Sequence, residues 1–241
     1  DQHVIRVHPT EYWQRLQAAE PPVGAPAVAL DPDTWLGPGS IEAARRAAGA
    51  ACAGVRAVLD GECESVFCAV RPPGHHAEAT RAMGFCLLNH VAIGAAAALA
   101  AGLHRVAIAD FDVHHGNGTE AIFRDHPAVL YLSSHQSPLY PGTGASVDDD
   151  PEHIVNAPLP PGTSSDAFRH AWRQRLLPAL REFNPQLLLI SAGFDGHRLD
   201  PLAQMELEIA DYCWITDALL ETAAGTSAGT VSSLEGGYDL D

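Results

Sequence analysis

The chain has 241 residues, enough for one sizeable domain, and carries a formal net charge of -16 with only 14 Lys and Arg. Because contacts with nucleic-acid phosphates need clustered basic side chains, this balance argues against a nucleic-acid partner, while it is compatible with cationic substrates. The longest apolar run, 91–101, is too short to span a membrane, and the five cysteines, which form no C-x-x-C pair, favour a reducing, cytoplasmic setting.

Helical and strand-like segments alternate along the chain. Short apolar runs bounded by Gly and Pro predict buried strands, and the Ala- and Leu-rich segments between them predict helices. Such alternation is typical of an α/β fold with a parallel sheet covered by helices on both faces. In chain order, the expected elements are a short helix and loops over 1–39, a helix over 40–59 with Ser40 as its N-cap, a strand over 65–70, an apolar helix over 89–101 closed by Gly102, a strand over 105–110, a short helix over 119–124, a strand over 128–132, a loop over 133–144, an irregular acidic segment over 148–161, a helix over 165–183, a strand over 186–191, a helix over 202–222 and a strand over 229–234.

Polar side chains gather where the predicted strands end, most densely after the strand over 105–110. In an extended backbone alternate side chains share a face, so Asp110, Asp112 and His114 are expected to project together, with the intervening apolar residues packed on the other side. In parallel sheets, ligands bind beyond the carboxyl ends of the strands. This segment therefore predicts a metal site, although a solvated polar loop is the alternative.

A third ligand is expected at another strand end, where Asp195 lies among glycines. Together Asp112, His114 and Asp195 supply three N/O donors, the number that a catalytic zinc site uses while it keeps one position open. Iron(II), cobalt and manganese remain alternatives, because ligand type alone does not select among divalent ions. For Asp195 the competing interpretation is a turn formed by an Asp-Gly pair.

Three further side chains suit acid–base chemistry. His75 and His76 follow a Pro-Pro-Gly loop that can aim both rings at one point, and a neutral imidazole can take up a proton and return it to a leaving amine. Asp110 and Asn117 are candidates to hold the second ring nitrogen. Tyr238, after two glycines, can donate its phenol to a carbonyl oxygen as charge develops there. Each residue alone is also compatible with an ordinary loop or packing role.

Taken together, these segments resemble the zinc-dependent histone deacetylase superfamily in its bacterial class II-like branch, which includes histone deacetylase-like proteins, acetylpolyamine amidohydrolases and acetoin utilization proteins. The resemblance implies the three-layer arginase/deacetylase fold, a multistranded parallel sheet between helices. It also implies a single deacetylase domain over 1–241 that lacks the family's N-terminal segment and its C-terminal helix. The matching motifs are Arg71 to His76, Gly84 to Cys86, Asp110 to Gly118, Ser137 to Gly144, Ser191 to Asp195, Asp200 to Leu202 and Glu235 to Tyr238.

The resemblance also assigns roles. It implies zinc on the predicted ligand trio, His76 as general base and then acid, and His75 as its electrostatic partner, paired with Asp110. Asn117 stands where the class I pattern has aspartate, and Tyr238 would polarise the acetyl carbonyl. The implied channel residues are Gly84, Phe85 and Tyr140, with Leu202 at the mouth, and an implied potassium ion would lie near Asp110, Asp112, His114, Ser133 and Ser134.

The function expected on this basis is zinc-dependent hydrolysis of acetyl-lysine, in a protein or as a small acetylated amine, to free amine and acetate. Leu202 is apolar where polyamine-selective relatives carry an acidic gatekeeper, which argues against acetylpolyamine as the preferred substrate. Two alternatives are an inactive acyl-lysine or acetate binder of the same fold and a binuclear manganese ureohydrolase. The ureohydrolase would need further Asp and His ligands and would leave Tyr238 without a role. An oligomer is possible.

Overall fold

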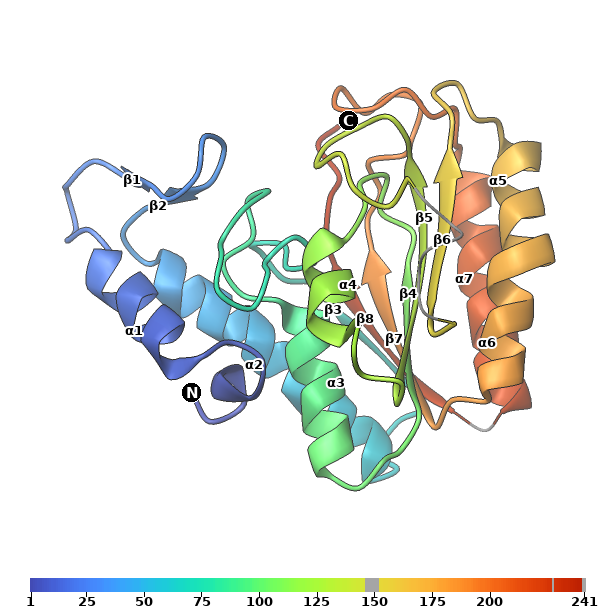
Figure 1. Ribbon diagram of the computed structural model, residues 1–241, viewed down its shortest axis with the longest axis horizontal. Coiled ribbons are helices and arrows are strands. Elements are labelled where there is room, and N and C mark those ends of the chain that lie inside the picture. The colour runs from blue at the N-terminus through green and yellow to red at the C-terminus, as the bar shows by residue number, and fades with distance from the viewer. Residues whose placement is uncertain (146–151, 227, 240–241) are drawn as a thin grey trace.

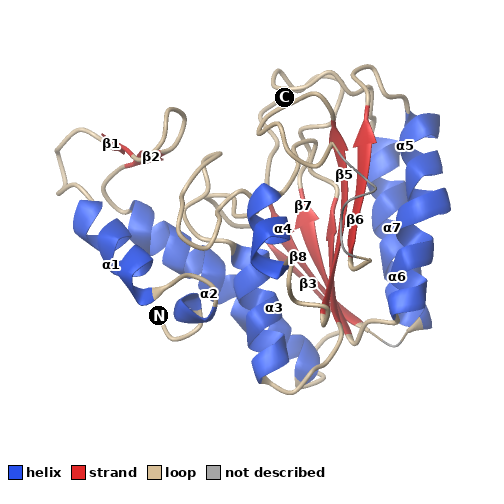
Figure 2. Ribbon diagram, in the orientation of Figure 1, coloured by secondary structure: helices blue, strands red, loops and turns tan. Residues whose placement is uncertain are grey.

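A six-stranded parallel sheet forms the centre of the molecule, as a computed structural model describing residues 1–145, 152–226 and 228–239 shows (Figures 1 and 2). Every strand pairs in parallel with its neighbours, so all the carboxyl ends lie at one edge of the sheet. In the spatial order of the sheet, the strands are β3 (Ser65–Cys68), β8 (Gly229–Leu234), β7 (Leu187–Ala192), β4 (Val106–Asp110), β5 (Val129–Gln136) and β6 (Ile154–Leu159).

Helices cover both faces of the sheet and complete a three-layer fold. One face is covered by α2 (Ser40–Leu59) and α3 (His90–Ala100), with the short α4 (Asn117–Phe123) following β4. The other face is covered by α5 (Ser165–Ala171), a π-helical turn (Trp172–Leu176), α6 (Leu177–Phe183) and α7 (Ile209–Gly225) (Figure 1). Among the described residues, no helix combines the length and the apolar character that crossing a bilayer would require.

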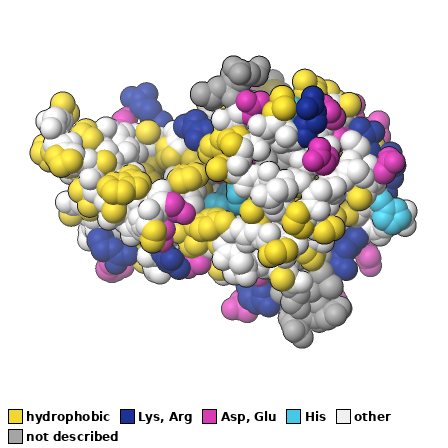
Figure 3. Space-filling model, turned by 90° about the horizontal axis from the view of Figure 1, so that it is seen from above, with side chains coloured by type: hydrophobic (Ala, Val, Ile, Leu, Met, Phe, Trp, Pro, Cys, Tyr) yellow, Lys and Arg dark blue, Asp and Glu magenta, His cyan; other side chains and the backbone are white. Residues whose placement is uncertain are grey.

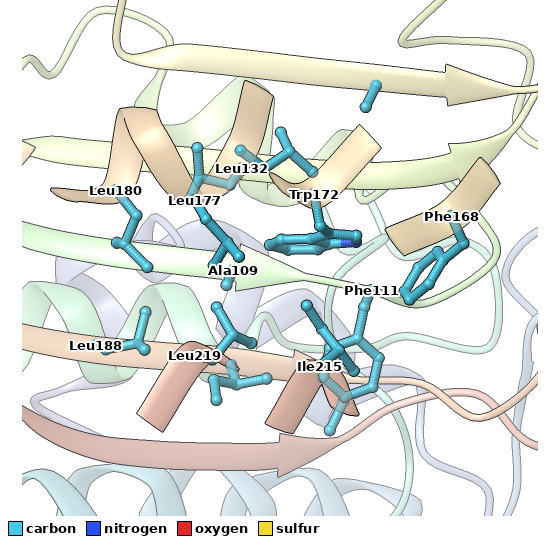
Figure 4. Close-up of a cluster of buried hydrophobic side chains, with 14 of the residues drawn as sticks. Ala109, Phe111, Leu132, Phe168, Trp172, Leu177, Leu180, Leu188, Ile215 and Leu219 are labelled. Atoms are coloured by element: carbon cyan, nitrogen blue, oxygen red, sulfur yellow. The ribbon is translucent and has the colours of Figure 1, made fainter. Parts of the chain in front are cut away.

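The period-two alternation of β4 divides its side chains between two cores. Val106 and Ile108 pack in the cluster beneath α2 and α3, whereas Ala107 and Ala109 pack beneath α5, α6 and α7. The second cluster contains the fully buried Trp172, which lies near Phe168 and Leu132 (Figure 4). Because both faces of the central strands are buried, their sequences are almost continuously apolar.

The N-terminal region forms a smaller apolar cluster of its own. A 3-10 turn (Val4–Arg6) and α1 (Thr10–Ala19) precede a hairpin of β1 (Val28–Ala29) and β2 (Trp35–Leu36), which the sequence did not predict. Of these elements, the sequence predicted the helix α1 but not the hairpin. Tyr12 is buried here and its hydroxyl donates to the Leu87 carbonyl at 2.8 Å, so α1 is tied to the segment that precedes α3.

Most predicted elements are present, and the differences lie at their ends. Ser40 is not the N-cap of α2: Gly39 takes that place at φ 86°, and the Ser40 hydroxyl accepts the Gly37 N–H at 3.0 Å. The strand predicted over 65–70 ends at Cys68, and α4 begins two residues earlier than expected, at Asn117. The predicted helix over 165–183 is continuous but contains the π-helical turn, just before the helix-disrupting Pro178.

Three larger corrections concern the second half of the chain. β5 continues to Gln136, so the predicted loop over 133–144 begins later. The segment over 148–161 was wrongly expected to be irregular, since Ile154–Leu159 is β6; its residues 148–151 lie outside the described part of the chain. The helix predicted from Leu202 begins at Ile209, where Glu208 and Asp211 form a capping box.

Candidate active site

The predicted site residues converge at the carboxyl ends of β3, β4, β7 and β8. The turn after β4 carries Asp112 and His114, the turn after β7 carries Asp195, and the segment after β8 carries Tyr238. His75 and His76 come from the loop between β3 and α3. Figure 3 looks onto this edge of the sheet and shows histidine near the middle of the face, among hydrophobic side chains.

Asp112, His114 and Asp195 form one buried cluster whose candidate ligand atoms lie within 4.8 Å of one another. His114 Nδ1 is 3.2 Å from Asp112 Oδ1 and 3.0 Å from Asp195 Oδ2. Main-chain donors hold the remaining carboxylate oxygens, because Gly236 N–H donates to Asp112 Oδ2 at 2.8 Å and Val113 N–H donates to Asp195 Oδ1 at 3.0 Å. The turn after β4 and the turn after β7 thus bring the three predicted donors together.

The electrostatics of this cluster are those of a cation site. Burial, and then the charge of Asp112, raises the pKa of Asp195 to about 6. Burial alone would lower the pKa of His114, but its hydrogen bonds to Asp112 and Asp195 outweigh that effect and raise the pKa to about 10. The three donors converge on one point, where a divalent ion can bind in place of a proton. One imidazole and two carboxylates fit zinc.

His75 is paired with a carboxylate. Its Nδ1 lies 3.0 Å from Asp110 Oδ2, and the same oxygen accepts the Tyr131 hydroxyl at 3.0 Å. Its Nε2 lies 3.8 Å from Asp112 Oδ1. Burial would lower the pKa of His75, yet the charges of Asp112 and Asp110 prevail and raise the pKa well above its usual value. The His75 imidazole therefore holds its second proton more tightly than a free imidazole does.

The pKa of His76 is shifted in the opposite direction to that of His75. Its Nδ1 lies 2.8 Å from Asn117 Oδ1, and the Asn117 amide nitrogen donates to Glu78 Oε1 at 3.0 Å, which fixes the orientation of the amide. Burial, followed by the charge of the neighbouring His75, holds the pKa of His76 well below its usual value. With Nδ1–H donating to Asn117, the Nε2 atom is left as a proton acceptor.

All four predicted channel residues line one cavity of about 240 Å³. The Tyr238 ring meets Phe85 edge to face, with ring centroids 5.9 Å apart. Gly84 has φ 56°, and a Cβ there would collide with the His76 imidazole, so the close approach requires glycine. The sequence did not single out Asp33, which also lines the cavity. The lining residues are Asp33, His76, Gly84, Phe85, His114, Leu139, Tyr140, Leu202 and Tyr238.

Glu235 is a buried residue whose role the sequence did not reveal. Its Oε2 accepts the Gly74 N–H at 2.6 Å and the His75 N–H at 3.1 Å, and its Oε1 accepts the Ser191 hydroxyl at 3.2 Å. Burial raises the pKa of this carboxyl to about 7. Glu235 therefore holds the histidine loop against β7 and β8. The feature of the sequence that could have indicated this role is the position of Glu235 in the Glu-Gly-Gly-Tyr motif.

The residues predicted near potassium are only partly adjacent. Ser133 lies opposite Asp110 in the register of β4 and β5, and its hydroxyl is 2.9 Å from His135 Nδ1. The Ser134 hydroxyl instead accepts the Trp172 Nε1–H at 3.0 Å, so this side chain points into the helical layer of α5 and α6. A contribution of Ser134 to a cation would therefore come from its main chain.

Comparisons with known proteins agree with this architecture. The family model of the histone deacetylase domain matches residues 1–241. The chain is 41% identical to a histone deacetylase-like amidohydrolase of Pseudomonas aeruginosa, across 99% of this chain and 64% of that protein. It is 39% identical to a probable deacetylase of Archaeoglobus fulgidus, across 99% of this chain and 67% of that protein.

A solved structure confirms the predicted fold class. The crystal structure of the HDA15 HD domain matches with a TM-score of 0.92 and 36% identity, across 100% of this chain and 69% of that chain. The chain therefore has the three-layer α/β fold of that domain. It spans about two thirds of the length of these three proteins.

Proposed function

Because the chain belongs to the histone deacetylase family, we propose that it is a zinc-dependent amidohydrolase that removes the acetyl group from acetyl-lysine, in a protein or as a small acetylated amine. The products are the free amine and acetate. One observation carries the proposal: the cavity that is lined by His76 and Tyr238 is also lined by His114, a member of the buried ligand trio. The proposed metal site, proton acceptor and phenol thus border one cavity.

Asp112, His114 and Asp195 would hold the zinc ion. Bound there, zinc supplies Lewis-acid catalysis, which polarises a carbonyl and acidifies water. The main-chain bonds from Gly236 and Val113 to the two carboxylates keep those groups in place. Such supporting contacts orient metal ligands and strengthen binding.

His76 accepts the proton of the attacking water at Nε2 and later gives it to the nitrogen of the leaving amine. This assignment rests on the lowered pKa of His76, which keeps the ring neutral, and on the Asn117 contact, which holds its Nδ1–H. The cationic His75, anchored by Asp110, discourages a second positive charge on His76 in the resting state. In this proposal His75 carries the positive charge, and His76 transfers the proton.

Tyr238 donates a hydrogen bond to the acetyl oxygen as negative charge develops on it. Burial, followed by the charges of Asp112 and Asp195, raises the pKa of Tyr238 above its usual value, so the phenol keeps its proton at neutral pH. A donor placed in a site of low polarity stabilises a developing oxyanion far more than the same donor in water. Loss of such a donor typically costs a factor of about 100 to 1,000 in turnover.

The cavity suits an acyl-lysine side chain. Phe85, Leu139, Tyr140 and Leu202 give it apolar walls that can pack against methylene groups, and the reacting groups lie further in. Leu202 itself offers no charge to a second ammonium group, which supports acetyl-lysine over acetylpolyamine. The carboxylate of Asp33 also lines the cavity and would attract a cation, so it favours the opposite preference.

A potassium ion near Asp110, Asp112, His114, Ser133 and Ser134 is part of the proposal. The carboxylates of Asp110 and Asp112 are fully buried in this region, and buried anions favour a nearby cation.

The alternatives gain less support. Among the described residues, a single group of three candidate metal ligands was found, whereas a binuclear manganese ureohydrolase would need a second set. An inactive acyl-lysine or acetate binder would have no need for a neutral His76 and a protonated Tyr238 in the same cavity.

The test is reconstitution of metal-free protein with zinc, followed by measurement of acetate and amine released from an acetyl-lysine peptide. We expect equal amounts of both products, and loss of turnover when a chelator is added. An N-acetylated diamine, supplied at the same concentration, should be the poorer substrate. Stoichiometric zinc binding without product would favour the inactive binder instead.

A further inference from the structure

Asp200 is a buried carboxylate outside the ligand trio, and its two oxygens serve two different segments. Oδ1 accepts the Leu202 N–H at 3.0 Å. Oδ2 accepts the Tyr238 N–H at 2.6 Å and the Asp239 N–H at 3.3 Å. The side chain is 6% exposed, so water competes little for these bonds.

The two segments that Asp200 joins have distinct places in the cavity. Leu202 lines the cavity and is 42% exposed, whereas Tyr238 lines it together with the buried His76 and His114. Tyr238 follows Gly237, whose φ of 142° is readily available only to glycine, so its backbone has few intrinsic restraints on the N-terminal side. The short bond from Tyr238 N–H to Asp200 supplies a restraint.

We propose that Asp200 is a positioning residue that holds Tyr238 through its main chain and ties the phenol to the mouth of the channel at Leu202. This inference rests on the proposed hydrolysis for its effect on rate, but its structural part does not. A ligand that displaces the Leu202 segment would act on the Tyr238 backbone through one carboxylate. Because rates fall by about 100-fold for a misplacement of about 1 Å, loosening this tie should lower turnover strongly.

Asp200→Asn is the informative variant, because an amide cannot accept hydrogen bonds on both sides. We expect kcat for an acetyl-lysine peptide to fall by about 10-fold or more, with unchanged zinc content. In a Tyr238→Phe background, the same substitution should change kcat by less than about 2-fold, because the group it positions is already lost. If the two losses multiply, Asp200 acts elsewhere and the proposal is overturned.

Asp211→Asn is the matched control. Asp211 is also buried and accepts a main-chain N–H, that of Glu208 at 2.9 Å, but it lies at the start of α7 and does not line the cavity. We expect it to lower thermal stability and to leave kcat within about 2-fold of wild type. An equal loss of kcat in both variants would assign the effect of Asp200 to general destabilisation.

Amide hydrogen exchange tests the tie without any turnover. In the wild-type protein the Leu202 and Tyr238 amides should be protected, and in Asp200→Asn the amide of at least one should exchange about 10-fold faster or more. Fast exchange of both amides in the wild type would overturn the proposal even if the variant failed to fold. Protected amides in a protein without deacetylase activity would leave the tie intact and reject the proposed function.

Discussion

His76 Nδ1 lies 2.8 Å from the side-chain oxygen of Asn117, so a neutral amide, not a carboxylate, orients the proposed base. An amide fixes the ring without attracting a proton to it. Together with burial and the charge of His75, this leaves the pKa of His76 low. The proposed base is therefore ready to accept a proton at neutral pH.

Asn117→Asp should move the acidic limb of the pH profile of kcat/KM upward. The new carboxylate would stabilise the imidazolium and raise the pKa of His76, by about one unit or more. Because the base must be neutral to accept a proton, acidification would then abolish activity at a higher pH than in the wild-type protein. Asn117→Ala removes the acceptor without adding charge, so its acidic limb should not rise. Identical limbs in all three proteins would reject His76 as the titrating base.

Tyr238→Phe should bind zinc normally and lose most of its turnover. Tyr238 is not one of the three proposed ligands, and its proposed role is a hydrogen bond to the developing oxyanion. We expect kcat to fall by about 100-fold or more, measured beside the zinc content of both proteins. Turnover equal to that of the wild type would refute this role.

Asp195→Ala should lose the metal. The substitution removes one of three proposed ligands and leaves His114 bonded to Asp112 alone. Zinc retention after dialysis, measured by elemental analysis, should drop while the fold, monitored by far-UV circular dichroism, persists. Asp211→Asn serves as a control that should retain zinc. Full occupancy in Asp195→Ala would remove this residue from the ligand set.

Acid should destabilise the protein through His8. Its ring accepts the Asn89 N–H at Nε2, 2.9 Å away, and donates from Nδ1 to the Ala79 carbonyl at 3.1 Å. Burial lowers its pKa to about 4, against about 6.5 in an unfolded chain. As pH falls from about 6.5 to 4, the unfolded state takes up a proton that the folded state does not, so stability falls.

The expected cost at pH 5 relative to pH 7 is about 2 kcal/mol. Urea unfolding of wild type and His8→Gln at both pH values would measure it, and the variant should lose less stability between them. The exposed His104→Gln is the control that should follow the wild type. A variant with the wild-type pH dependence would show that His8 is not responsible.

Polar and apolar residues alternate over 110–114, and this alternation made it possible to predict which side chains lie on the side of the metal site. Asp110, Asp112 and His114 lie on the site side, while Phe111 and Val113 are buried in the cluster beneath α5 to α7. β4 ends at Asp110 and residues 112–114 form a bend, but the apolar and the polar side chains still lie on opposite sides. The family resemblance then indicated which distant motifs would join this face.

The strands missed or shortened by the sequence analysis carry polar or strand-breaking residues. β6 contains Pro158, which is tolerated because β6 is an edge strand of the sheet, and among the described residues it pairs with β5 alone. The last residues of β5 are polar yet buried, and their side chains find partners such as Trp172 and Gln204. Local composition cannot show such partners.

Asp200 and Glu235 were missed as supporting groups for the same reason. Glu235 accepts from Gly74 across 161 residues of sequence, and Asp200 accepts from Tyr238 across 38. Both are carboxylates that satisfy main-chain donors of loops, and such contacts depend on how the loops fold together.

Hydrolysis in water enriched in oxygen-18 would show whether water attacks the acetyl carbonyl. Zinc-loaded protein and an acetyl-lysine peptide would be incubated together, and the masses and amounts of both products would be measured by mass spectrometry. We expect acetate carrying one solvent oxygen and an equal amount of unlabelled lysine peptide, because water attacks the acetyl carbonyl and the amine leaves with a proton from His76. Zinc-loaded protein that releases no acetate, or acetate without solvent oxygen, would contradict it.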